Sequence, residues 1–72
     1  MIIQVNGETR VVRSDLTVAD LLRELEIHTE QVAVEVNLHI LERMEFESRP
    51  LQEGDCVEIL SFVGGGAQEF FH

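Results

Sequence analysis

The sequence predicts an α+β fold in which a small β-sheet packs against one helix. Apolar and polar residues alternate near both ends of the chain, which is typical of strands with one buried face. Between them, apolar residues recur with the spacing of one amphipathic helix. The chain has 72 residues, of which 44% are hydrophobic, so we expect a single domain with a small core and no deep substrate cleft.

The chain opens with the pattern of a β-hairpin. Residues 1–5 predict a strand whose odd-numbered members, all apolar, share one face. Asn6-Gly7 then predicts a type I′ turn, because both central residues of that turn need positive φ. Residues 8–13 are expected to return as the antiparallel partner strand.

One helix is predicted from Val18 to Glu26. Thr17 is the expected N-cap, and Asp20 stands where the acidic residue of a capping box belongs. Four apolar residues follow at the spacing of a single helical face: Val18, Leu21, Leu22 and Leu25.

The second half of the chain predicts three more segments. Residues 31–37 alternate as a half-buried strand, and Ile40-Leu41 is a candidate short strand after a bend. Residues 42–48 are either a short helical turn or an irregular link. After a turn at residues 53–55, residues 56–63 form the expected last strand.

This order of elements is that of the β-grasp, or ubiquitin-like, fold. We expect a mixed sheet of about four to five strands packed on one main helix, formed by residues 1–63. Residues 64–72 are expected to be a flexible, glycine-rich tail.

The last predicted strand carries a candidate docking pair, Leu60 and Phe62. Both fall on the same face as Glu58, so either they are exposed and available to a partner, or sheet twist or the tail covers them. Sequence leaves both alternatives open.

Gly64, Gly65 and Gly66 follow that strand directly. A glycine run on its own is typical of a linker or a frayed end. Without Cβ atoms, however, the backbone is also narrow enough to thread into a partner's active site. The position after the last strand of a β-grasp domain favours the thread.

The charge of the chain restricts its partners. The formal net charge is −9, with 14 acidic residues, and all five basic residues are arginines. Such a surface repels phosphate, so we expect neither nucleic-acid nor anionic-membrane binding. A basic protein partner fits better, although the acidity could also serve solubility alone.

The remaining chemistry-bearing residues predict no metal or catalytic site. Cys56 is the only cysteine, so no internal disulfide is possible, and we expect a sheet residue and not a nucleophile. His28, His39 and His72 lack zinc-ligand spacing. The opening residues resemble no signal peptide, and a cytoplasmic location is expected.

Taken together, the motifs resemble those of the ThiS family of sulfur carriers. The similarity is carried by the opening hairpin, the helix around Ala19, Val34-Glu35-Val36-Asn37, Arg43 and above all residues 53–66. For Arg43, a surface or strand-end salt bridge is the simpler expectation.

The resemblance implies a carrier that performs no catalysis and binds no cofactor itself. In the family, an E1-like adenylyltransferase of the ThiF type uses MgATP to adenylate the terminal glycine carboxylate. A cysteine desulfurase supplies sulfur, and the resulting thiocarboxylate serves a thiazole synthase of the ThiG type in thiamine biosynthesis. By resemblance, Gly66 is the sulfur-carrying terminus, Gly64 and Gly65 enter the partner, and Leu60 and Phe62 dock.

One departure from the family pattern stands at residues 67–72. Family members typically end at the glycines, whereas here Ala67 holds the Gly66 carbonyl in an amide. A peptidase must therefore remove six residues before Gly66 can react. The alternatives are a MoaD-like carrier or a carrier for another pathway, and a β-grasp module that binds partners non-covalently with its tail intact.

Overall fold

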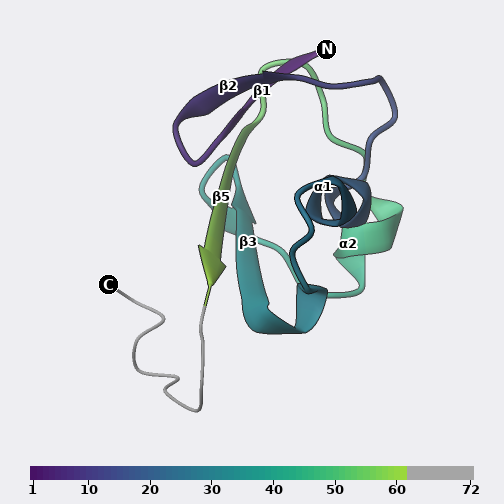
Figure 1. The fold of residues 1–72 in the computed structure, drawn as a ribbon, viewed down its shortest axis with the longest axis vertical. Helices are drawn as coiled ribbons and strands as arrows, with labels where there is room; N and C mark the ends of the chain where they lie inside the picture. The colour runs from purple at the N-terminus through teal and green to yellow at the C-terminus, as the bar shows by residue number, and fades with distance from the viewer. Residues whose placement is uncertain (62–72) are drawn as a thin grey trace.

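A computed structural model of the chain describes residues 1–61, and Figure 1 shows the arrangement of their helices and strands. The predicted tail, together with Phe62 and Val63, lies outside the described residues. The elements follow in the order β1 (Ile2–Val5), β2 (Glu8–Val11), α1 (Val18–Glu24), the 3₁₀ helix η1 (Thr29–Gln31), β3 (Val32–Val36), β4 (His39–Ile40), α2 (Glu45–Ser48) and β5 (Cys56–Ser61).

The strands form one mixed sheet in the order β2-β1-β5-β3-β4. β5 is last in sequence but central in space: it runs parallel to β1 and antiparallel to β3. The two outer pairs, β1 with β2 and β3 with β4, are antiparallel hairpins. This β-grasp sheet, with its one main helix, confirms the predicted fold class.

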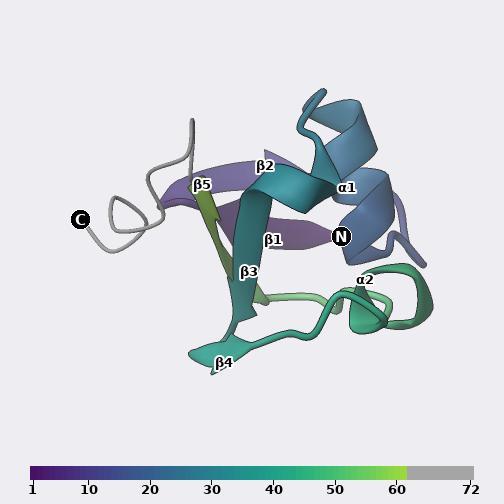
Figure 2. The same cartoon turned by 90° about the horizontal axis from the view of Figure 1, so that it is seen from below.

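Within residues 1–61, both helices cover the same face of the sheet, and no described element covers the other face, which is called the open face below. Figure 2 shows both helices on the same side of β3 and β5. The alternation predicted from the sequence is confirmed, because the even positions of β3 are buried while the odd ones are half-buried. The buried core residues are Ile3, Val5, Leu16, Val18, Ala19, Leu21, Leu22, Val32, Val34, Val36, Leu41, Phe46, Leu51 and Val57.

The start of α1 follows the predicted capping box. Thr17 Oγ1 accepts from the Asp20 amide at 3.1 Å, and an Asp20 carboxylate oxygen accepts from the Thr17 amide at 3.1 Å. The helix ends at Glu24, two residues before the predicted end. Glu26 adopts a left-handed φ of 60°, and the Ile27 amide donates back to the Leu22 carbonyl, which stops the helix.

The boundaries of β1 to β4 differ from prediction by one or two residues. β2 ends at Val11, because the chain then turns so that Arg13 meets Asp20 and Glu24 of α1. β3 begins at Val32, since η1 takes the residue before it. β4 begins at His39, one residue earlier than predicted.

Within residues 1–61 Arg43 forms no salt bridge, so the expected pair is not found in the described part of the chain. Its guanidinium donates to the backbone carbonyls of Thr29, Glu30 (3.1 Å) and Val32 (3.4 Å), and it lies 5.9 Å from the ring centroid of Phe46. These hydrogen bonds therefore connect the segment before α2 to η1 and to the start of β3. For residues 42–48 the sequence left a short helical turn and an irregular link as alternatives. The structure has the short helix α2 in this segment, and the side chain of Phe46 in α2 is buried.

The capping box predicts an acid-dependent stability. Hydrogen bonds from the Thr17 backbone, followed by Arg23, lower the pKa of Asp20 to about 2. An unfolded aspartate has a pKa of ~3.9, so the Asp20 carboxylate stabilises the fold above that pH, and its contribution is lost as the pH falls towards 2. We expect Asp20→Asn to be less stable at neutral pH and to lose part of this acid dependence.

Chemical denaturation between pH 7 and 2 measures the effect. Glu24→Gln is the matched control, because it removes a carboxylate that also faces Arg13 but that does not cap the helix. Equal acid dependence in the wild type and in Asp20→Asn would contradict the assignment.

Candidate functional site

The described part of the predicted docking pair is the end of β5. Leu60 pairs with Ala33 of β3 and is half-buried, which places it between the two alternatives that sequence left open. Phe62 and the predicted reactive segment Gly64, Gly65 and Gly66 lie outside the described residues. The structure therefore describes the sheet that precedes this segment in the sequence. β5 is the central strand of that sheet.

Asn6 holds the second half of β5 in place. Its side-chain Oδ1 accepts from the Ile59 amide at 2.7 Å, and its Nδ2 donates to the Ile59 carbonyl at 3.3 Å. Its own amide donates to the Val57 carbonyl at 2.9 Å. β1 ends at Val5, so the Asn6 side chain supplies the ladder bonds that β1 no longer makes.

A second asparagine holds the start of β5. The backbone amide of Asn37 donates to the Cys56 carbonyl at 2.8 Å, and its Oδ1 accepts from the Cys56 amide at 3.0 Å. Its Nδ2 donates to Asp55 at 2.9 Å, and Asp55 also accepts from the Gln52 amide at 2.8 Å. This network fixes the loop that leads into the strand.

Both asparagines have left-handed backbones, with φ of 50° at Asn6 and 53° at Asn37. Asparagine tolerates this region better than most residues, and its short amide can bond a neighbouring backbone. The asparagine side chain of each hairpin turn therefore also forms hydrogen bonds with β5.

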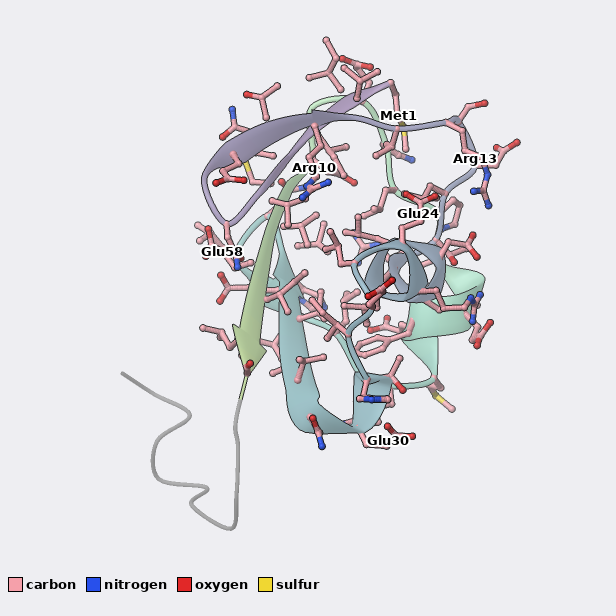
Figure 3. All side chains as sticks on the ribbon, viewed as in Figure 1. Met1, Arg10, Arg13, Glu24, Glu30 and Glu58 are labelled. Atoms are coloured by element: carbon pink, nitrogen blue, oxygen red, sulfur yellow. The ribbon has the colours of Figure 1, made fainter. Side chains whose placement is uncertain are left out.

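The open face of the sheet carries a hollow at the start of β5. The hollow is about 380 Å³ in volume and is lined by Glu35, Asn37, Leu38, Cys56 and Glu58. Glu35 and Glu58 stand directly opposite each other in the β3–β5 register. Figure 3 shows Glu58 on the side of β5 away from α1.

Leu38 is the least expected residue of this region. It has a left-handed φ of 71° in the turn between β3 and β4, and its side chain is 90% exposed. A left-handed conformation costs an L-residue other than glycine about 1 kcal/mol. Leu38 is thus neither buried nor in a backbone conformation that favours leucine.

Two arginines pair with an acidic residue of α1, and no arginine lines the hollow. Arg13 and Arg23 contact Asp20 at 3.1 and 2.9 Å, beside α1. The hydrogen bond to Asp20 raises the pKa of Arg23 above its ordinary value. Ion pairs within residues 1–61 involve neither Glu35 nor Glu58.

The described residues hold no cluster of three or more histidine, cysteine or acidic side chains that could bind a metal. His28 and His39 are exposed and lie on separate elements, and Cys56 is an exposed residue at the start of β5. His72 lies outside the described range. Neither α1 nor α2 is long and apolar enough to cross a membrane.

Sequence analysis found the two turns but missed what their side chains do. The Asn6-Gly7 signal predicted the first hairpin, and nothing in it indicates that the amide reaches Ile59, which lies 53 residues further on. The bend after Asn37 was also predicted. An apolar residue in a turn, Leu38, was the sequence feature that could have indicated the hollow, and the prediction did not include it.

The fold and the central position of β5 define a class, the ubiquitin-like β-grasp proteins. Within this class, residues 3–66 match the model of the ThiS family. The chain belongs to the ThiS family.

Relatives of known structure and known name agree with this assignment. The crystal structure of the thiamine biosynthesis protein ThiS from Geobacter metallireducens superposes with a TM-score of 0.79 at 40% identity, covering 92% of this chain and 100% of that one. The sulfur carrier protein ThiS of Bacillus subtilis is 34% identical over 65 residues, covering 89% of this chain and 98% of that protein.

A third relative is a larger protein. The thiazole synthase of Paramagnetospirillum magneticum is 38% identical over 65 residues, covering 90% of this chain. This chain spans 20% of the length of that thiazole synthase.

The Asn6 contacts predict a specific loss of stability. Asn6→Gly keeps an easy left-handed turn but removes both bonds to Ile59, so we expect a loss of about 1–2 kcal/mol in the free energy of unfolding. Amide hydrogen exchange at Ile59 should become faster. Urea unfolding and exchange measured by NMR test both effects.

Asn6→Asp provides the matched comparison for this variant. It keeps an oxygen that accepts from the Ile59 amide, but it replaces the Nδ2 donor by an oxygen that faces the Ile59 carbonyl, so its loss measures the Nδ2 bond together with that repulsion. An Asn6→Gly variant as stable as the wild type would show that the side chain does not hold β5.

Proposed function

We propose that this chain is a sulfur carrier for the formation of the thiazole ring of thiamine. The observation that carries the proposal is the extent of the family match, which runs from residue 3 to residue 66 and so includes all three consecutive glycines. The names of the relatives support the same pathway, since they are sulfur carriers and a thiazole synthase.

The reactive group is the carboxylate of Gly66 once residues 67–72 have been removed by a peptidase. An E1-like adenylyltransferase of the ThiF type then joins this carboxylate to the α-phosphorus of MgATP, and pyrophosphate leaves. Adenylation is needed because a free carboxylate is a poor electrophile, whereas AMP is a good leaving group.

Sulfur from a cysteine desulfurase persulfide attacks the activated carbonyl and displaces AMP. A thiol then attacks the desulfurase sulfur of the resulting acyl disulfide, which releases the thiocarboxylate on Gly66 and leaves a disulfide between that thiol and the desulfurase cysteine. The thiocarboxylate is the sulfur donor for a thiazole synthase of the ThiG type.

The described body contributes position and docking in this scheme. In this scheme Gly64 and Gly65, which follow β5 in the sequence, enter the partner's active site, and Leu60 and Phe62 contact the partner. The chain itself is a cosubstrate and not an enzyme, and MgATP belongs to the activating protein.

Two truncations test the identity of the reactive terminus. A chain that ends at Gly66 should support ATP–pyrophosphate exchange with its adenylyltransferase without any peptidase. A chain that ends at Gly65 should fold equally well, because the core residues described above all precede residue 60, but it should not acquire sulfur. The full-length chain should react only after cleavage.

Intact mass spectrometry of the chain from its own cells provides the second measurement. We expect the loss of residues 67–72 and the replacement of one oxygen by sulfur. A chain that is always full-length and inert to its adenylyltransferase favours a β-grasp module that binds partners non-covalently. A thiocarboxylate consumed by another pathway's enzyme, as in a MoaD-like carrier, would change the pathway but not the chemistry.

A further inference from the structure

The turn between β1 and β2 contains a pair of residues that can react with each other. Asparagine is a chemically labile residue, because the backbone nitrogen of the residue after it can attack the carbon of its side-chain amide. The reaction is fastest when glycine follows, since glycine has no side chain to shield that nitrogen. Asn6-Gly7 is the only asparagine–glycine pair in the sequence.

The turn itself is open to solvent. Asn6 and Gly7 are both exposed. A Cβ placed on Gly7, which has a φ of 84°, would meet no atom within 4 Å. Neighbouring groups therefore do not crowd the attacking residue.

The amide that would be attacked is held by β5. Asn6 Oδ1 accepts from the Ile59 amide at 2.7 Å, and Asn6 Nδ2 donates to the Ile59 carbonyl at 3.3 Å. These two bonds fix the orientation of the amide toward the strand. The side chain therefore has to leave Ile59 before its carbonyl carbon can meet the Gly7 nitrogen.

We propose that Asn6 is a deamidation site whose rate is controlled by the pairing of β5. When the second half of β5 opens, the Gly7 nitrogen gives up its proton and bonds to the side-chain carbonyl carbon of Asn6. The side-chain NH₂ takes a proton and leaves as ammonia, and a five-membered imide remains. Water then adds to the imide and breaks one of its two C–N bonds, which leaves either aspartate or isoaspartate at position 6.

Either product weakens the contact that controls the reaction. Aspartate has no donor for the Ile59 carbonyl, and it adds a negative charge to a chain whose net charge is already −9. Isoaspartate carries the backbone through the former side-chain carbons, which lengthens the turn that fixes the register of Val5 with Glu8. The modification therefore loosens the second half of β5, and it does so whether or not the chain carries sulfur.

The test follows deamidation of the full chain at mildly alkaline pH, in buffer and in urea, by peptide mapping that separates aspartate from isoaspartate. Hydrogen bonds such as those to Ile59 lower the population of the open state, so we expect Asn6 to react about tenfold more slowly in the folded chain. Asn37 is the internal control. It also bonds to β5, but Leu38 shields the nitrogen after it, so it should stay unmodified in both conditions.

Hydrogen exchange identifies the opening that permits the reaction. As urea is added below the unfolding midpoint, deamidation should accelerate in parallel with exchange at the Ile59 amide, and before exchange accelerates at the buried Leu22 of α1. Gly7→Ala is the matched variant, measured in the urea-unfolded chain, where the φ of the turn imposes no strain. It should slow the reaction at Asn6 several-fold, because the new methyl group shields the nitrogen.

Three results would overturn the inference. Equal rates at Asn6 in the folded and the unfolded chain would show that β5 gives no protection. An unfolded chain that forms neither aspartate nor isoaspartate at position 6 would remove the site itself. A rate that follows exchange at Leu22 instead of Ile59 would assign control to global unfolding. The proposed function is unaffected by all three, since it is tested at Gly66.

Discussion

The structure depends on how its last strand is inserted between two earlier ones. β5 lies between β1 and β3 in the middle of the sheet, so the fold closes only when the end of the chain has returned to its beginning. Such long-range pairing is entropically costly, and it must be specified at both ends of the strand. Asn37 and Asp55 specify the start of β5, and Asn6 specifies its second half. The two hairpin turns thereby fix the position of β5 in the middle of the sheet.

The two faces of the described sheet differ in what they carry. The helix face holds the buried core, the capping box and the Arg13–Asp20–Arg23 contacts. Within residues 1–61, no buried side-chain nitrogen or oxygen lacks a hydrogen-bond partner. The open face instead shows a like-charge pair and an exposed leucine with an unfavourable backbone. Substitutions on the two faces should therefore affect different properties of the protein.

Local rules predicted the elements well, because those elements depend on local chemistry. Thr17 with Asp20 predicted the start of α1, and Asn6-Gly7 predicted the first turn, since capping and positive φ are decided within a few residues. The helix end was missed because Glu26 adopts a left-handed conformation without being a glycine. The role of Arg43 was missed because its acceptors are backbone carbonyls. Every residue has a carbonyl, so the sequence does not indicate which ones accept from a given side chain. The predicted reactive glycines lie outside the described residues, so that part of the site rests on the family match alone.

The face of the described sheet that the helices do not cover carries terms that oppose folding. Glu35 and Glu58 stand opposite each other in the β3–β5 register, and like charges in that position destabilise a sheet. Leu38 adopts a left-handed φ of 71° while its side chain is 90% exposed, so the backbone cost is not offset by burial of that side chain. The core face and the hydrogen bonds that Asn6 and Asn37 make to β5 must offset both terms, and the position of β5 therefore depends strongly on these two asparagines.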